Sequence, residues 1–314
     1  MWAVQYRGHG GPERLIVEEV RSPRLRPGQA LVRVMASGVS RIDAECLAGR
    51  LPHGVGFPKQ IGLDAIGQVI DGNGTSLAAG TWVAIVLGLE PFARRGTTVE
   101  LLAVEPERCG AFPAGYTPQP GDCGLVLGGL TAVKAVRDVL HTRRGQRVLV
   151  VGAGGPVGLA AIQVATLLGA HVDAVSGSRA MVACEQAGAQ QVWDHRGDTS
   201  TLSNSGAYDG LVIAAGRPAD WMAAVRRGAR AAVTDGGAWP GSLPAGLHRR
   251  VATRPVAAGH ATADLEWLGR HIAGGDLVPV AGTLYAPRTA CEAYASLGAG
   301  RTAGARLIDH EEAG

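Results

Sequence analysis

Four glycines stand just after an apolar run in the middle of the chain, and three of them, Gly152, Gly155 and Gly158, are spaced three residues apart. They belong to the segment Arg147-Val-Leu-Val-Val-Gly-Ala-Gly-Gly-Pro-Val-Gly158. Glycines permit a tight turn and let the backbone approach a pyrophosphate closely, and the N-terminus of a following helix points free N–H groups at that anion. Pro156 suits such a helix start because its missing N–H is not needed there. The pattern predicts that a dinucleotide is bound by Gly152, Gly155, Pro156, Val157 and Gly158.

The end of the next apolar run indicates which dinucleotide to expect. An acidic residue there binds the adenosine ribose of NAD, whereas Ser, Thr or Arg accommodates the extra phosphate of NADP. In His171-Val-Asp-Ala-Val-Ser-Gly-Ser-Arg179, the acidic Asp173 stops short of the tip, which holds Ser176, Ser178 and Arg179. We therefore expect NADPH, bound by these three residues. The alternatives are that Asp173 binds the ribose of NADH, or that Ser and Arg only cap the next helix.

Strands that alternate with helices surround these segments. Strands are expected at 147–151, 171–175 and 210–214, and helices at 131–140, 157–168 and 179–187. This order predicts a parallel sheet with helical crossovers, the doubly wound Rossmann arrangement.

A different pattern fills the first third of the chain and returns at its end. Short strands separated by turn residues are expected at 2–6, 15–20, 30–36, 65–70, 81–86 and 100–104. They predict a mainly antiparallel β domain, on which the C-terminal elements at 263–273, 278–284, 289–297 and 305–308 pack. The fold class is thus α/β, with one domain from 1–120 plus 261–314 and a dinucleotide-binding domain at 121–260.

Composition excludes several classes of protein. A chain of 314 residues with 46% hydrophobic content can fill two cores. The net charge of +3 is small and the arginines are scattered along the sequence, so we expect no nucleic-acid partner. No signal peptide and no apolar run of about 18 residues is present, so we expect a cytoplasmic protein without a membrane partner. The five cysteines form no C-x-x-C pair, which disfavours disulfides and a zinc knuckle.

Several further segments occur in the same order as in a known superfamily. They are Ala36-Ser-Gly-Val-Ser-Arg-Ile-Asp43, Ile61-Gly-Leu-Asp-Ala-Ile-Gly67, Gly129-Leu-Thr-Ala132 and the glycine segment that ends at Gly158. Together they resemble the medium-chain dehydrogenase/reductase superfamily, and within it the zinc-free quinone oxidoreductase and enoyl reductase branch. The resemblance covers almost the whole chain and implies a GroES-like fold for the β domain and a homodimer.

The zinc ligands of other members of that superfamily are replaced here. Those members carry a Cys and later a Gly-His-Glu where this chain has Ser40 and Gly62-Leu63-Asp64. Neither Ser nor Leu is a suitable zinc ligand, so we expect no metal. Hydride transfer to a C=C bond beside a carbonyl needs no Lewis-acid metal.

The resemblance also implies roles for residues outside the glycine segment. Ser40 is expected near the nicotinamide and Thr131 beneath the cofactor. His195 is expected beside the adenine phosphate, with Arg196 as a phosphate partner. The residues expected to border the nicotinamide ribose are Ala215, Gly216 and Gly259.

A proton donor is the least defined part of the site. Related enoyl reductases place a Tyr where this chain has Leu51. Of the nearby polar residues, His53 has the most suitable ordinary pKa for protonating an enolate, with a solvated loop residue as the alternative. Asp43 is either catalytic or bonded to the local turn. Asp64 is expected to pair with an arginine, and solvent is a further possible proton source.

These features predict an NADPH-dependent, metal-independent reductase that transfers hydride to an enone, a quinone or an enoyl substrate in the interdomain cleft. One alternative is a discrete enoyl reductase that acts on a polyketide-type intermediate. The other is a cofactor-binding regulatory or structural protein with little turnover.

Overall fold

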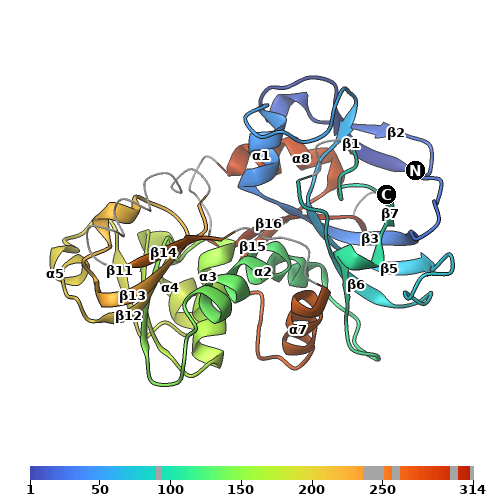
Figure 1. Ribbon diagram of the computed structural model, residues 1–314. Coiled ribbons are helices and arrows are strands. Elements are labelled where there is room, and N and C mark those ends of the chain that lie inside the picture. Colours follow the sequence, from blue (N-terminus) through green and yellow to red (C-terminus); the bar gives the residue numbers. More distant parts are fainter. Residues whose placement is uncertain (90–93, 236–250, 257–261, 298–302, 312–314) are drawn as a thin grey trace. The chain divides into compact units, whose positions relative to one another are not determined.

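The apolar run Arg147–Val151 (β9) lies inside a parallel sheet (Figure 1). The strand order in the computed structural model is β11-β10-β9-β12-β13-β14, and all registered pairs are parallel. The other strands are β10 (His171–Ser176), β11 (Gln191–Asp194), β12 (Tyr208–Ile213), β13 (Val225–Val233) and β14 (Ala252–Pro255). This order reverses between β9 and β12, as in a doubly wound dinucleotide-binding fold, and confirms the Rossmann sheet predicted from the sequence.

The structure describes residues 1–89, 94–235, 251–256, 262–297 and 303–311. The chain divides into two compact units. Unit 1 comprises Met1–Leu127, Gly259–Arg301 and Ala305–Gly314, and unit 2 comprises Gly128–Ala258 and Thr302–Gly304. Unit 2 contains the parallel sheet and is called the Rossmann unit below.

Helices accompany the strands of the Rossmann unit. They are α3 (Pro156–Leu167), α4 (Met181–Gln186) and α5 (Ser200–Ser203), preceded by α2 (Leu127–Val133), which begins at the last residue of unit 1. The helix expected at 131–140 begins earlier, at Leu127, and continues after Val133 as a π-helical turn, Lys134–Val139. The sequence pattern did not indicate β11, β13 or β14, which complete the sheet.

Unit 1 is mainly antiparallel. One sheet has the order β2-β1-β4 and the other β15-β16-β3-β5-β6-β8, with β7 paired to β3. The strands are β1 (Trp2–Tyr6), β2 (Ile16–Glu19), β3 (Ala30–Val39), β4 (Lys59–Gln60), β5 (Asp64–Asp71), β6 (Trp82–Val86), β7 (Leu101–Val104), β8 (Cys109–Ala111), β15 (Gly282–Tyr285) and β16 (Ala305–Asp309). Alternate residues of the long β3 and its neighbours form an apolar core. β16 pairs antiparallel with β3, which joins the C-terminal segment to the first strands.

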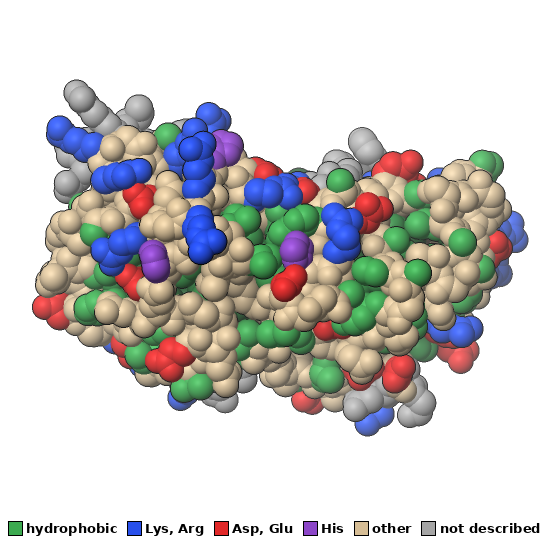
Figure 2. All heavy atoms as spheres, turned by 90° about the horizontal axis from the view of Figure 1, so that it is seen from below, with side chains coloured by type: hydrophobic (Ala, Val, Ile, Leu, Met, Phe, Trp, Pro, Cys, Tyr) green, Lys and Arg blue, Asp and Glu red, His purple; other side chains and the backbone are tan. Residues whose placement is uncertain are grey.

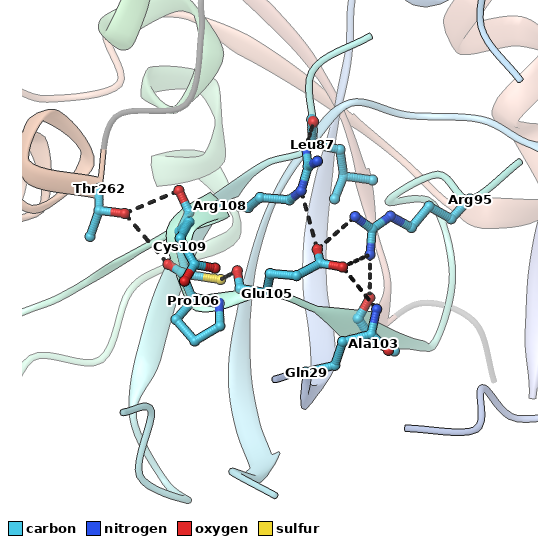
Figure 3. A network of polar contacts seen from close by, with 10 residues as sticks. Gln29, Leu87, Arg95, Ala103, Glu105, Pro106, Arg108, Cys109 and Thr262 are labelled. Atoms are coloured by element: carbon cyan, nitrogen blue, oxygen red, sulfur yellow. Dashed lines mark hydrogen bonds and ion pairs between the residues drawn. The ribbon is translucent and has the colours of Figure 1, made fainter. Parts of the chain in front are cut away.

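Unit 1 also contains α1 (Arg41–Leu47), α7 (Thr262–Ala273) and α8 (Ala290–Ser296). A polar network around Glu105 connects several of its elements (Figure 3). The Glu105 carboxylate accepts hydrogen bonds from Arg95, at 2.6 Å, and Arg108, at 3.1 Å. The Thr262 hydroxyl at the start of α7 donates to the Glu107 carbonyl at 3.1 Å. The network therefore fixes the turn between β7 and β8 and the beginning of α7.

Arginines that are distant in the sequence meet at the amino ends of the Rossmann strands. Arg226 pairs with Asp209 at 2.8 Å, and Asp209 Oδ2 also accepts a hydrogen bond from the Arg147 backbone N–H at 2.8 Å. On the face seen in Figure 2, Lys and Arg side chains gather over the Rossmann unit.

In the part of the chain that is described, no helix is long and apolar enough to cross a membrane.

Candidate functional site

The glycine turn lies at the carboxyl end of β9, where the strand order reverses. Gly152 has φ +75°, a left-handed conformation that favours glycine. The backbone N–H groups of Gly152 and Ala153 donate to the Val175 carbonyl at 3.0 and 2.9 Å. A Cβ at Gly152 would lie 2.5 Å from the Ala215 nitrogen. The turn is therefore held between β10 and Ala215, the second residue after β12.

The other two glycines of the turn differ in their surroundings. A Cβ at Gly158 would lie 2.5 Å from Ala153 Cα, so this glycine lets α3 pack closely on the turn. At Gly155, the N-cap of α3, the only neighbour recorded within 4 Å of a Cβ among the described residues is the Gly152 carbonyl oxygen, at 3.9 Å. No side chain caps this helix, and the first turn of an α-helix leaves backbone N–H groups without intrahelical partners. This open N-terminus fits the pyrophosphate of a dinucleotide.

The tip of β10 lies beside the turn after β11. His195 follows β11, and both its backbone N–H and its ring Nδ1 contact the Ser176 carbonyl, at 2.9 and 3.0 Å. Because a carbonyl only accepts, Nδ1 carries the proton, and Nε2 remains as the second polar atom of the ring. The exposed fraction of the His195 side chain is 53%. The imidazole is thus fixed at the strand tip with one edge toward solvent.

The three residues proposed for the NADP phosphate are not equally accessible. Ser178 and Arg179 are exposed in a 3₁₀ turn, Ser178–Ala180. Ser176 is buried, and its hydroxyl donates to the Gly177 carbonyl at 3.2 Å. Arg196 is exposed next to His195. Two arginines and one serine therefore offer accessible donors around the tip.

Asp173 is engaged away from the strand tip. Its Oδ2 accepts a hydrogen bond from the Tyr208 hydroxyl at 2.6 Å and pairs with Arg147 at 3.1 Å. Arg147 is the first residue of β9, so this carboxylate faces the amino ends of the strands. Burial, together with the nearby Asp173 charge, raises the pKa of Tyr208.

The remaining residues expected to contact the cofactor have mixed positions. Thr131 is buried within α2. Ala215 and Gly216 directly follow β12, and Gly216 has φ +97°. Gly259 lies outside the described residues.

In unit 1, Ser40 and Asp43 form a reciprocal cap at the start of α1. The Ser40 hydroxyl and backbone N–H donate to Asp43 Oδ2 at 2.7 and 2.8 Å, and the Asp43 backbone N–H donates to Ser40 Oγ at 3.2 Å. Asp43 is almost completely buried, with 2% of its surface exposed. Burial raises its pKa to about 7, although the hydrogen bonds from Ser40 oppose this shift.

Among the described residues, Asp64 pairs with no arginine, so the structure does not show the pairing expected from the sequence. Its Oδ2 accepts a hydrogen bond from the Leu127 N–H at 3.3 Å, whereas its buried Oδ1 has no hydrogen-bond partner. Burial, and then the Asp43 charge, raise the pKa of Asp64 to about 8. A Cβ at Gly38 would lie 2.2 Å from Oδ1, so glycine is required beside this carboxyl. The apolar strand β5 carries Asp64 into the core at its first residue.

His53 is buried, with 5% of its surface exposed, which overturns its interpretation as a solvated loop residue. Its Nε2 lies 3.4 Å from the Arg95 carbonyl oxygen. This contact joins residues that are 42 positions apart, so no local pattern indicates it. The sequence interpretation likewise missed Tyr294 of α8, whose side chain is buried close to Asp43.

In the described ranges, no three His, Cys, Asp or Glu side chains are grouped in a way that would hold a metal ion. The donor set at the positions of the superfamily's zinc ligands includes the hydroxyl of Ser40 and the aliphatic side chain of Leu63. These side chains do not fit a zinc site.

Comparison with known proteins agrees with this fold. Residues 26–136 match the family model described as the alcohol dehydrogenase GroES-like domain. A trans-enoyl reductase of Aspergillus terreus, pgmF, is 29% identical across 92% of this chain and 88% of its own length. The chain belongs to the medium-chain dehydrogenase/reductase superfamily. Its relatives place it in the quinone oxidoreductase and enoyl reductase branch of that superfamily.

Two quinone oxidoreductases are also similar to this chain, one in sequence over part of its length and one in structure over nearly all of it. The quinone oxidoreductase of Pseudomonas aeruginosa is 29% identical over 61% of this chain and 58% of its own length. The structure of the quinone oxidoreductase from Coxiella burnetii has a TM-score of 0.88 at 20% identity, with 99% of each chain covered, and shows that the fold is shared. Unit 1 therefore has the GroES-like fold that the sequence predicted. As a member of this superfamily, whose enzymes use NAD(P)H, the protein is an oxidoreductase.

Proposed function

We propose that this oxidoreductase uses NADPH and, without a metal, transfers hydride to an activated C=C bond or a quinone. The observation that carries the choice of cofactor is the arrangement at the end of β10. Asp173 is occupied by Tyr208 and Arg147, whereas Arg179 is exposed next to the strand tip. An arginine at this place favours the 2′-phosphate of NADP, and a free carboxylate would favour the ribose of NAD.

Most of the described residues proposed to hold the cofactor follow the carboxyl ends of β9, β10, β11 and β12. The open N-terminus of α3 at Gly155 suits the pyrophosphate of the cofactor. The surface around Ser178 and His195, at the tip of β10, suits its adenosine end. When bound, the nicotinamide supplies a hydride. The residues proposed for these contacts are Thr131, Gly152, Gly155, Pro156, Val157, Gly158, Ser176, Ser178, Arg179, His195, Arg196, Ala215, Gly216 and Gly259.

On unit 1, we propose that Ser40 provides the hydroxyl group nearest to the chemistry. Addition of hydride to the β-carbon of an enone leaves an enolate, which requires one proton to complete the reduction. The Ser40 hydroxyl is oriented by Asp43 at 2.7 Å, which gives it a fixed direction. His53 is a weaker candidate for proton donor because it is buried against the 94–96 segment.

The likeness to a trans-enoyl reductase over nearly the whole chain supports a second candidate, the reduction of an enoyl intermediate in a biosynthetic pathway. Both candidates share the hydride chemistry and differ in the substrate. A panel that contains quinones, simple enones and enoyl thioesters separates them by their kcat/KM values.

The cofactor proposal is tested by fluorescence titration of the purified protein with NADPH and NADH. We expect NADPH to bind more tightly and Arg179→Ala to abolish that difference. Arg227→Ala is the matched control, because Arg227 is also exposed on the Rossmann unit but lies near the start of β13. Equal binding of both nucleotides by the unaltered protein contradicts the choice of NADPH. Tight binding without turnover on the whole panel contradicts the reductase and favours a cofactor-binding regulator.

A further inference from the structure

One exposed histidine of the Rossmann unit lies beside the tip of β10. His195 directly follows β11, and a Cβ at Gly177, the residue after β10, would lie 3.5 Å from His195 Cε1. The same tip packs against the glycine turn. A Cβ at Gly154 would lie 2.4 Å from Ala180 Cβ and 3.8 Å from Ser176 Cβ. The imidazole is therefore part of the strand tip that borders the turn proposed to hold the pyrophosphate.

The contacts with the Ser176 carbonyl determine which ring nitrogen carries the proton. The carbonyl oxygen accepts a hydrogen bond from the His195 backbone N–H at 2.9 Å and another from Nδ1 at 3.0 Å. A neutral imidazole has one N–H group, so with Nδ1 as the donor, Nε2 has only a lone pair. Nε2 accepts hydrogen bonds in this neutral ring and donates one when the ring is protonated. Binding of a proton at Nε2 therefore changes this atom from an acceptor to a donor.

NADPH and NADH present different groups to such an atom. The ribose of NADH carries a 2′-hydroxyl, which can donate to neutral Nε2. A phosphate group above its second pKa, about 6, has only acceptor oxygens. Beside a neutral ring, the 2′-phosphate of NADPH would place one lone pair against another. Beside a protonated ring, it would accept a charge-assisted hydrogen bond, which is about twice as strong as a neutral one.

The charged groups around the ring come from both segments that meet there. Asp194 Oδ1 lies 3.5 Å from His195 Nδ1 and accepts a hydrogen bond from the Arg196 backbone N–H at 3.0 Å. Arg196 is exposed next to His195, and Arg179 is exposed two residues after Gly177. Among side chains of these types, imidazole is the one that ordinarily changes its charge between about pH 5 and 8. In this range the charge of the strand tip depends on His195.

We propose that His195 makes the preference for NADPH over NADH depend on pH, so that it is larger when Nε2 is protonated and smaller when Nε2 is neutral. This inference rests on the cofactor site proposed above. The proton comes from water and binds to the lone pair of Nε2, and no group is oxidised or reduced. Because an ordinary imidazole is mostly neutral at pH 7, binding of NADPH should bring a proton onto the ring.

The first test counts protons without turnover. NADPH and NADH are titrated into the full chain by calorimetry at pH 7, in buffers of different ionisation enthalpy. We expect uptake of roughly half a proton for each NADPH bound and none for NADH. In His195→Gln the uptake should disappear, because an amide donates a hydrogen bond without titrating. His171→Gln is the control and should retain the uptake, since His171 is also exposed but begins β10 at its opposite end.

The second test measures cofactor preference as a function of pH by fluorescence titration. We expect the Kd for NADH divided by the Kd for NADPH to increase about fivefold from pH 8 to pH 6.5. This ratio should not increase in His195→Gln, whereas His171→Gln should behave as the unaltered protein. If His195→Gln does not fold, His195→Asn replaces it with the same expected result. Its shorter amide can still donate to the Ser176 carbonyl but has no atom in the place of Nε2.

The outcomes separate the two proposals. Tighter binding of NADPH without proton uptake, or with a ratio that does not change with pH, overturns the role of His195 but leaves the NADPH site in place. Equal uptake by His195→Gln and the unaltered protein assigns the proton to another group and also overturns that role. If neither nucleotide binds, both proposals are wrong.

Discussion

The Tyr208 hydroxyl donates a hydrogen bond to Asp173 Oδ2 at 2.6 Å, toward the amino ends of the Rossmann strands. The same oxygen pairs with Arg147, whose guanidinium carbon lies 4.8 Å from the centre of the Tyr208 ring. Asp173 therefore links β9, β10 and β12. Its role in the structure is to stabilise the sheet.

Replacement of Asp173 by Asn should lower stability without changing cofactor preference. The amide loses the charge that pairs with Arg147 and is a poorer acceptor for Tyr208. We expect a decrease of about 1–3 kcal/mol in the free energy of unfolding, measured by urea denaturation. The ratio of the dissociation constants for NADPH and NADH should stay within about twofold. A large change in that ratio would mean that Asp173 binds the ribose.

Alanine at Gly155 should weaken nucleotide binding, whereas alanine at Gly158 should lower stability. At Gly155 a Cβ meets little of the protein, so Gly155→Ala should fold normally but weaken nucleotide binding by about tenfold or more, which corresponds to about 1.4 kcal/mol. At Gly158 a Cβ meets Ala153 Cα at 2.5 Å, so Gly158→Ala should cost about 1–3 kcal/mol of stability. Thermal unfolding and fluorescence titration of both variants check this. Normal nucleotide binding by Gly155→Ala would contradict the placement of the pyrophosphate at the N-terminus of α3.

The Glu105 network should make unit 1 sensitive to acid. The hydrogen bonds and charge of Arg95, together with Gln29, outweigh burial and lower the pKa of Glu105 from 4.5 to about 2. Because the pKa is lower in the folded state, the stabilisation is present above pH 4.5 and is lost as the pH falls toward 2. With the carboxylate side chain 33% exposed, Glu105→Gln should cost about 1–2 kcal/mol at pH 7.

The measurement is the pH dependence of urea unfolding. The difference between Glu105→Gln and the unaltered protein should shrink as the pH falls below 4.5. Glu107→Gln is the control, since it removes a carboxylate from the same turn. A constant difference at all pH values would show that the effect is not ionic.

The buried Asp64 should have the opposite dependence on pH. Its pKa rises from 3.8 to about 8 on folding, so the folded state holds more protons between these values and stability decreases as the pH rises through this range. Asp64→Asn removes this proton uptake. We expect its free energy of unfolding to vary less between pH 5 and 8 than that of the unaltered protein, as measured by urea denaturation. Parallel curves for the two proteins would mean that Asp64 is ionised throughout.

The sequence by itself determined the local framework of the nucleotide site. An apolar strand, a glycine turn and a helix follow one another without interruption from Arg147 onward, and each depends only on neighbouring residues. The contact between Ser40 and Asp43 also depends only on neighbouring residues, because the two are three positions apart and form a capping box. The alternation of strands and helices likewise indicated the fold class.

Tertiary structure decided the environment of single side chains. Asp173 stops short of its strand tip in the sequence, but only the pairing of β10 with β9, and of β9 with β12, brings Arg147 and Tyr208 to it. His53 is buried and contacts the Arg95 carbonyl, and Asp64 interacts electrostatically with Asp43 and Tyr294, although the three residues come from β5, α1 and α8. Burial and long-range charge depend on packing between distant segments, and these two quantities set the protonation of a carboxyl group. Local patterns therefore located the turn proposed to bind phosphate, whereas the fold determined the protonation of single acids.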